Sequence, residues 1–173
     1  MNDKIVICDI DSTMCDHWKR IRNNTIPSWP GGVISSKAWS REEVLQDELL
    51  PRCSEFLWRL QCNGFYIRYL TARGWPHARQ ITVEQLTNWN VPNPQDVMFT
   101  SNLADKVSVL SSNICNYYVD DFMTGQENAI GTFHSETAKA IESIGIYVVV
   151  FRNDWMDVWE QIQIYEQRSK NAV

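Results

Sequence analysis

The sequence predicts an α/β fold in which helices cover both faces of a parallel sheet. Short, continuously apolar runs recur along the 173-residue chain, and segments with helical signals separate them. Two of the runs end on paired aspartates, Asp9 with Asp11 and Asp120 with Asp121. Strands that alternate with helices form parallel sheets with right-handed crossovers. We therefore expect a three-layer α/β/α Rossmann-like domain with five parallel core strands.

The expected strands are the short apolar runs themselves. Each lacks polar alternation, which is typical of a strand buried on both faces, and each is bounded by polar or turn-forming residues. The first begins at Ile5 and ends on Asp9; the others are residues 65–70, 97–99, 114–119 and 146–151.

Helix signals lie between these runs. Ser40 before two glutamates, Pro51, Pro76 and Asn102 are suitable residues for helix starts, and Gly64 follows a helix end. The expected helices are therefore one that begins after Ser40, and residues 51–61, 76–89, 103–111, most of 124–145, and 155–167.

Length and composition suit one globular domain. With 44% hydrophobic and 12% aromatic residues, the chain can bury a sizeable core, and no linker or repeat divides residues 1–173. Residues 14–41 contain prolines, glycines and three tryptophans and match no single regular element, so we expect a long loop or lid near the site. Within it, Lys19, Arg20 and Arg22 are expected on a solvated face.

Composition also excludes some classes of protein. No apolar run approaches the roughly 18 residues of a membrane span, and the first residues show no signal-peptide pattern. Five cysteines without Cys-x-x-Cys spacing argue against a disulfide framework. We therefore expect a cytoplasmic protein with no membrane partner. A net charge of −5 argues against an extended nucleic-acid-binding surface but leaves room for a local phosphate pocket.

Most of the polar side chains that could carry chemistry stand at the carboxyl ends of expected strands. In a parallel sheet these ends meet at one edge, where ligands bind. The residues are Asp9, Asp11, Thr71, Arg73, Asp120 and Asp121, with Lys106 on a nearby expected helix. Carboxylates this close repel one another, and oxygen ligands suit Mg²⁺. Asp-rich turns without chemistry, or a Ca²⁺ site, are the alternatives, although no Asp-x-Asp-x-Asp-Gly loop is present.

Four short motifs follow one another along nearly the whole chain. They are Asp9-Ile10-Asp11-Ser12-Thr13, Thr71, Lys106 and Asp120-Asp121. Together they resemble the motifs of the haloacid dehalogenase (HAD) superfamily of Mg²⁺-dependent phosphohydrolases. The resemblance implies that Asp9 is a nucleophile that forms an aspartyl-phosphate, and that Asp11 is the general acid and base. It also implies that Thr71 and Lys106 hold phosphoryl oxygens, and that Mg²⁺ binds Asp9, the main-chain carbonyl of Asp11, Asp120 and Asp121.

The connecting segments narrow the resemblance to one branch of the superfamily. None is long enough for a large cap domain, so we expect a nearly capless, open site that suits a phosphate on a bulky carrier. The stretch Leu70-Thr71-Ala72-Arg73-Gly74, followed by Arg79, Thr82, Leu86 and Trp89, is similar to the phosphatase domain of polynucleotide kinase/phosphatase proteins and to phage-type HAD phosphatases. That similarity implies a nucleotide or a nucleic-acid terminus as the phosphorylated substrate.

Three residues are expected to recognise the substrate beyond the transferred phosphoryl group. Arg73 and Arg79 could bind phosphate bidentately, and Trp18 could stack on a base. Two other functions remain open from the sequence: a small-metabolite phosphatase, and a catalytically idle HAD-like binding domain. The complete set of acids, threonine and lysine argues against the second.

Overall fold

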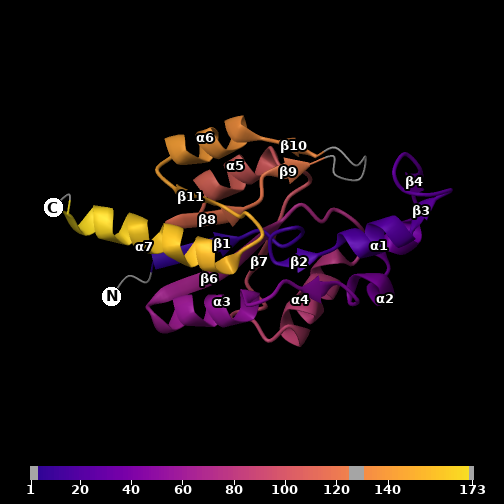
Figure 1. Ribbon diagram of the computed structural model, residues 1–173, viewed down its shortest axis with the longest axis horizontal. Coiled ribbons are helices and arrows are strands. Elements are labelled where there is room, and N and C mark those ends of the chain that lie inside the picture. The colour runs from indigo at the N-terminus through magenta and orange to yellow at the C-terminus, as the bar shows by residue number, and fades with distance from the viewer. Residues whose placement is uncertain (1–3, 125–130, 172–173) are drawn as a thin grey trace.

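The computed structural model describes residues 4–124 and 131–171, and it confirms the predicted class. Its main sheet has five parallel strands in the order β11-β8-β1-β6-β7. Their bounds are β1 Lys4–Cys8, β6 Phe65–Thr71, β7 Val97–Phe99, β8 Tyr117–Asp120 and β11 Tyr147–Val150. Figure 1 shows the sheet between two layers of helices.

The position of β1 in the middle of the sheet explains where the acids meet. Its last residue, Cys8, is paired with Tyr69 of β6 on one side and with Val119 of β8 on the other. The Asp9 backbone N–H then donates to Val119 O at 2.8 Å, which extends the ladder by one residue. The parallel register therefore brings the ends of β1, β6 and β8 to the same level.

Each face of the sheet packs against its own apolar helices. Alternate β1 side chains, Val6 and Cys8, point into a core with α3, α4 and α7, whereas Ile7 points into a second core with α5 and α6. The helices are α3 Cys53–Cys62, α4 Ala78–Asn88, α5 Asp105–Ser111, α6 Ser135–Ser143 and α7 Trp155–Asn171. Within the described ranges, no helix is long and apolar enough to cross a bilayer.

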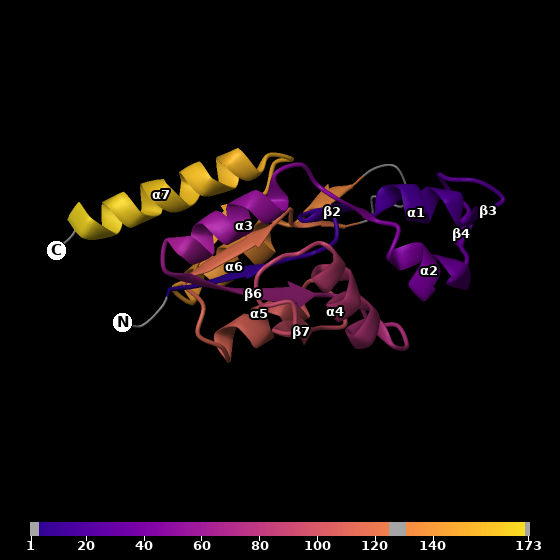
Figure 2. The ribbon, with the colours of Figure 1, turned by 90° about the horizontal axis from the view of Figure 1, so that it is seen from below.

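Residues 14–41, expected as a long loop or lid near the site, do not form an irregular loop, because this stretch belongs to a folded insertion. The insertion begins at β2 and ends at β5, which pair antiparallel, Cys15 with Leu49 and Asp16 with Glu48. Its elements are β2 Cys15–Asp16, α1 Trp18–Asn23, β3 Thr25–Ile26, β4 Val33–Ile34, the 3₁₀ helix η1 Ser36–Trp39, α2 Arg41–Val44 and β5 Glu48–Leu49. Figures 1 and 2 show it beyond the carboxyl edge of the sheet.

The segment after β8 also differs from the expected long helix. A short antiparallel ladder comes first, β9 Met123–Thr124 with β10 Thr132–Phe133, and α6 follows. Residues 125–130, part of the expected helix, lie outside the described residues. The His134 backbone N–H donates to Phe122 O at 2.9 Å, which returns the chain to the end of β8 before α6 starts.

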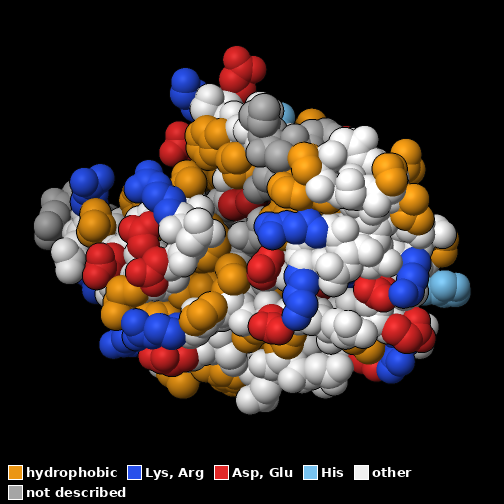
Figure 3. All heavy atoms as spheres, turned by 45° about the vertical axis from the view of Figure 1, so that its right-hand side comes forward, with side chains coloured by type: hydrophobic (Ala, Val, Ile, Leu, Met, Phe, Trp, Pro, Cys, Tyr) orange, Lys and Arg blue, Asp and Glu red, His pale blue; other side chains and the backbone are white. Residues whose placement is uncertain are grey.

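Charged side chains of both signs are mixed on the face shown in Figure 3, and no wide area of it is basic alone. A ligand that approaches this face would meet acids and bases side by side.

Candidate active site

Asp9 is the central residue of the candidate site. It follows β1 directly and is only 5% exposed. Lys106, in the first turn of α5, places Nζ 2.6 Å from Asp9 Oδ1 and 2.8 Å from Asp120 Oδ2. A single buried ammonium group therefore bridges the carboxylates that end two neighbouring strands.

Asp9, Asp120 and Asp121 form a group of donors that fits Mg²⁺. Carboxylate oxygens from all three lie within 4.8 Å of one another. Asp120 is oriented by its own contacts, since Oδ1 accepts from the Phe122 backbone N–H at 2.6 Å and Oδ2 accepts from the Tyr118 hydroxyl. Oxygen-only donors with several carboxylates are the preference of a small hard cation.

The electrostatics of this group favour a bound cation. Burial raises the pKa of Asp9 to about 8; the charge of Lys106 opposes that rise, and the carboxylates of Asp120 and Asp121 add to it. The pKa of Lys106 is also raised, because the charges of Asp120 and Asp9 outweigh its burial. A divalent cation beside the three carboxylates would favour their ionised forms.

Thr71, the last residue of β6, supplies an unsatisfied hydroxyl beside this group. The residue is 1% exposed, and its Oγ1 has no hydrogen-bond partner within the described part of the chain. A buried hydroxyl without a partner costs about 1–3 kcal/mol. Thr71 lines the same cavity as Asp9, so a ligand oxygen in that cavity would relieve the cost.

Asp11 is held by Arg73 in a bidentate ion pair. Arg73 Nε and Nη2 lie 2.7 and 2.8 Å from the two Asp11 carboxylate oxygens. Arg73 Nη1 donates to Thr82 at 3.0 Å and to Gln85 at 2.7 Å. Burial raises the pKa of Asp11, but the charge and hydrogen bonds of Arg73 outweigh it and hold that pKa well below its usual range.

This geometry bears on the expected roles of Arg73 and Asp11. Arg73 was expected to bind substrate phosphate, yet it is 2% exposed, and four of its five N–H groups are engaged. It cannot offer a bidentate contact without releasing Asp11. The Asp11 carboxylate likewise lies on Arg73 rather than in the group of three acids, so only its main-chain carbonyl remains for a metal at that group.

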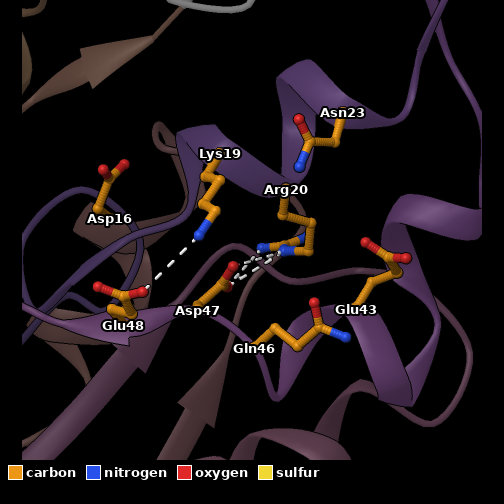
Figure 4. Close-up of a pocket in the computed structure, with 8 residues that line it drawn as sticks. All are labelled: Asp16, Lys19, Arg20, Asn23, Glu43, Gln46, Asp47 and Glu48. Atoms are coloured by element: carbon orange, nitrogen blue, oxygen red, sulfur yellow. Dashed lines mark hydrogen bonds and ion pairs between the residues drawn. The ribbon is translucent and has the colours of Figure 1, made fainter.

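Arg20 and Asp47 complete a buried ionic network that the sequence did not indicate. Arg20 was expected on a solvated face, but it is 4% exposed, and its Nε lies 3.0 and 3.1 Å from the Asp47 carboxylate oxygens. Figure 4 shows the two side chains pointing toward each other across the insertion. Arg20 Nη2 also lies 3.7 Å from Asp11 Oδ1. Arg20 and Asp47 are 27 positions apart in the sequence, and no spacing pattern pairs them.

Replacing the buried Arg73 by alanine should destabilise the protein by about 3–5 kcal/mol, because the half-buried carboxylate of Asp11 would lose its main partner. Urea denaturation of the wild type, Arg73→Ala, Asp11→Asn and the double variant measures the coupling between the two residues. We expect Asp11→Asn to lower the free energy of unfolding much less in the Arg73→Ala background than in the wild type. Additive losses would show that the Asp11–Arg73 pair does not stabilise the fold.

The site residues line a cavity of about 370 Å³. Most of the site residues predicted from the sequence line this cavity. They are Asp9, Asp11, Trp18, Thr71, Arg73, Lys106, Asp120 and Asp121. Arg79 is placed elsewhere: its guanidinium lies over the Phe99 ring, 4.9 Å from the centroid, and it lines a separate surface hollow with His77. Trp39 and Trp75 also line the site cavity. Trp39 lies in the stretch 14–41 that is expected near the site, whereas no sequence pattern singled out Trp75.

Three solved structures superpose on this chain, two of hydrolases and one of an acid phosphatase. A haloacid dehalogenase-like family hydrolase from Streptococcus pneumoniae superposes with a TM-score of 0.55 at 12% identity, covering 92% of this chain and 90% of that one. A hydrolase from Streptococcus pneumoniae TIGR4 gives 0.60 at 11% identity, with 94% and 100% covered. A class C acid phosphatase from Bacillus anthracis, solved with tungstate bound, gives 0.55 at 17% identity, with 88% and 68% covered. No protein-family model and no curated protein sequence matches the chain.

Proposed function

We propose that the protein is a Mg²⁺-dependent phosphohydrolase of the HAD type that removes phosphate from a phosphomonoester. The observation that carries the proposal is the position of Asp9. It follows the central strand directly, contacts Lys106 at 2.6 Å, and shares one cavity with Asp120, Asp121 and the unsatisfied Thr71 hydroxyl. A nucleophile, charge-neutralising groups and an oxyanion donor are thereby collected around one volume.

In the first half of the reaction, an Asp9 carboxylate oxygen forms a bond to phosphorus, and the bond from phosphorus to the leaving oxygen breaks. The leaving oxygen needs a proton. Because Arg73 keeps Asp11 ionised, we assign the source of that proton to the phosphomonoester itself, whose second pKa is about 6. Asp11 relays the proton to the leaving oxygen.

In the second half, water attacks the phosphorus of the aspartyl-phosphate, Asp11 accepts a proton from that water, and the Asp9 carboxylate is released with phosphate. Because Arg73 holds the pKa of Asp11 well below its usual range, the Asp11 carboxylate is ionised and has lone pairs available to accept that proton. Splitting one difficult displacement into two steps is the benefit of a covalent nucleophile.

The remaining groups stabilise charge on the transferred phosphoryl group. Mg²⁺, held by Asp9, Asp120, Asp121 and the main-chain carbonyl of Asp11, would supply positive charge beside the phosphoryl oxygens. Lys106 adds a second positive charge, and the Thr71 hydroxyl donates to a phosphoryl oxygen. The tungstate reported in the class C acid phosphatase is a tetrahedral oxyanion, which supports an oxyanion site on this fold.

For the substrate, we propose a nucleotide or a nucleic-acid terminal phosphate. Trp18 supports this choice, since it lines the cavity and its position is fixed by a hydrogen bond from Nε1 to Ser12 Oγ at 3.1 Å. An aromatic ring at this place can stack on a base.

A phosphate-release screen with and without Mg²⁺ tests the proposal. The substrates are nucleoside 3′- and 5′-monophosphates, oligonucleotides phosphorylated at either end, and sugar phosphates. We expect Mg²⁺-dependent release that is fastest from the nucleotide class, and none from Asp9→Asn prepared in parallel. Faster release from sugar phosphates would indicate a small-metabolite phosphatase, and no release from any substrate would indicate a binding domain without turnover.

A further inference from the structure

We propose that Trp39 and Trp75, together with Trp18, form an aromatic wall that seats the base of a nucleoside monophosphate while its phosphate reaches Asp9. The inference rests on the proposed function and narrows it, because it selects a mononucleotide over a nucleic-acid end. The name aromatic wall refers to these three tryptophans, which line the cavity together with the acids and Thr71.

Two members of the wall come from distant parts of the chain and meet at the site. Trp39 ends η1 of the insertion, and Trp75 follows β6, four residues after Thr71. Their rings are stacked, with centroids 5.0 Å apart and planes at 26°. Both side chains are half-buried, so each keeps some surface for contact with a ligand. Aromatic side chains beside a phosphate site give a base a large apolar surface on which to stack.

The wall is held in place before any ligand binds. The Arg20 guanidinium lies 5.3 Å from the Trp39 ring centroid, and that of Arg73 lies 5.6 Å from the Trp75 centroid. Both arginines are themselves fixed by carboxylates, Arg20 by the buried Asp47 and Arg73 by the half-buried Asp11. Rings that are already ordered lose little conformational entropy when a ligand binds, which increases the net gain from stacking.

One donor of the wall has no partner. The Trp75 indole N–H is buried and donates to no acceptor within the described residues. A carbonyl oxygen or ring nitrogen of a base that reached it would satisfy this donor, whereas a purely aliphatic leaving group would not.

The charges of the cavity favour a single phosphate group. Its lysine and arginine side chains, among the residues that the structure describes, are Arg20, Arg73 and Lys106, and each is already paired with a buried or half-buried carboxylate. A polynucleotide or a polyphosphate brings further negative charges, which proteins normally neutralise with additional lysines and arginines. A nucleoside monophosphate needs only the phosphoryl site and an uncharged surface for its base.

The size of the cavity agrees with this choice. Its volume of about 370 Å³ is at the small end of the roughly 300–1,000 Å³ of ligand pockets, a size suited to one nucleotide unit.

The test compares adenosine 5′-monophosphate with ribose 5-phosphate, which has the same phosphate and sugar but no base; 3′-monophosphates and uridine monophosphates extend the series. The wild type should show a kcat/KM about tenfold to a hundredfold higher for the nucleotide, the usual contribution of stacking on an aromatic side chain. Trp75→Ala and Trp39→Ala should reduce the ratio of kcat/KM for the nucleotide to kcat/KM for ribose 5-phosphate to about threefold or less, chiefly by loss of activity on the nucleotide. Trp75→Phe, which keeps an aromatic ring, should retain most of the ratio.

Trp58→Ala is the matched control, because Trp58 lies on α3 outside the cavity and is 39% exposed. It should leave the ratio unchanged, and thermal melts of every variant show which ones fold. Equal losses on both substrates in folded Trp75→Ala and Trp39→Ala, or an unchanged ratio, would overturn the aromatic wall. A terminally phosphorylated oligonucleotide that is hydrolysed faster than the mononucleotide would overturn the choice of a mononucleotide.

Failure of the proposed function would give a different result. The wild type would then release no more phosphate than an enzyme-free control, from ribose 5-phosphate or from any other substrate. Calorimetric titration of Asp9→Asn with adenosine 5′-monophosphate and with ribose 5-phosphate still tests the wall in that case. Tighter binding of the nucleotide that is lost on adding Trp75→Ala supports it, and equal binding of both ligands contradicts it.

Discussion

Replacing Asp9 by asparagine will lower the kcat for phosphomonoester hydrolysis by a factor of about 10⁴ or more, a loss typical of removing a catalytic nucleophile. The amide is nearly the same size as the carboxylate, but it is a poor nucleophile and a poor metal ligand. Its oxygen can still accept the hydrogen bond from Lys106, which lies 2.6 Å from Asp9 Oδ1. Steady-state kinetics on the best substrate of the screen measure the effect.

The fold should survive this substitution. Burial raises the pKa of Asp9, so its ionised form is disfavoured in the folded protein, and a neutral side chain removes that penalty. We expect a melting temperature within about 5 °C of the wild type. Asp157→Asn on α7, outside the cavity, is the control and should keep wild-type activity. A rate for Asp9→Asn above a tenth of the wild-type rate would exclude Asp9 as the nucleophile.

Removal of divalent cations should stop turnover altogether. With the metal chelated by EDTA, Lys106 still contacts the carboxylates of Asp9 and Asp120, but the phosphoryl oxygens lack their main source of positive charge. Addition of Mg²⁺ in excess over EDTA should restore the rate. Ca²⁺ should not, since its larger and more flexible coordination misplaces nucleophile and phosphate.

Metal binding has a second readout that does not depend on activity. A ligand present at about one hundred times its Kd stabilises the folded state by about 2.7 kcal/mol. Mg²⁺ should therefore raise the melting temperature of the wild type, and an Asp120→Asn/Asp121→Asn variant should show no rise. Full activity after complete chelation, or the same thermal shift in the variant, would contradict a metal site at these residues.

The sheet and the position of Asp9 could be predicted because both follow from local sequence. Continuous apolar runs indicated all five core strands, and Val97–Phe99 has the bounds expected for it. A parallel arrangement then requires the ends of neighbouring strands to meet, which brings Asp9 and Asp120 to one lysine. The parallel arrangement of the strands was therefore sufficient to predict that Asp9 and Asp120 meet.

The insertion could not be predicted, since its elements are too short for a periodic pattern. Its frame is the pairing of Cys15 with Leu49, a contact between residues far apart in sequence. Arg20 and Arg73 show the same limitation. The sequence predicted Arg20 on a solvated face and Arg73 at the substrate phosphate, and only the fold reveals that the carboxylates of Asp47 and Asp11 pair with them.

The measurement that tests the account most directly is chemical trapping of the phosphorylated residue. Asp11→Asn should slow hydrolysis of the aspartyl-phosphate, because the water then lacks its proton acceptor. Rapid acid quenching of this variant with substrate and Mg²⁺, reduction with borohydride and peptide mass spectrometry convert a phosphorylated aspartate into homoserine at its own position. We predict homoserine at residue 9 and nowhere else in the chain. Homoserine at another aspartate, or phosphate release with no trapped residue in either Asp11→Asn or the wild type, would contradict the assignment of Asp9 as the group that accepts the phosphoryl group.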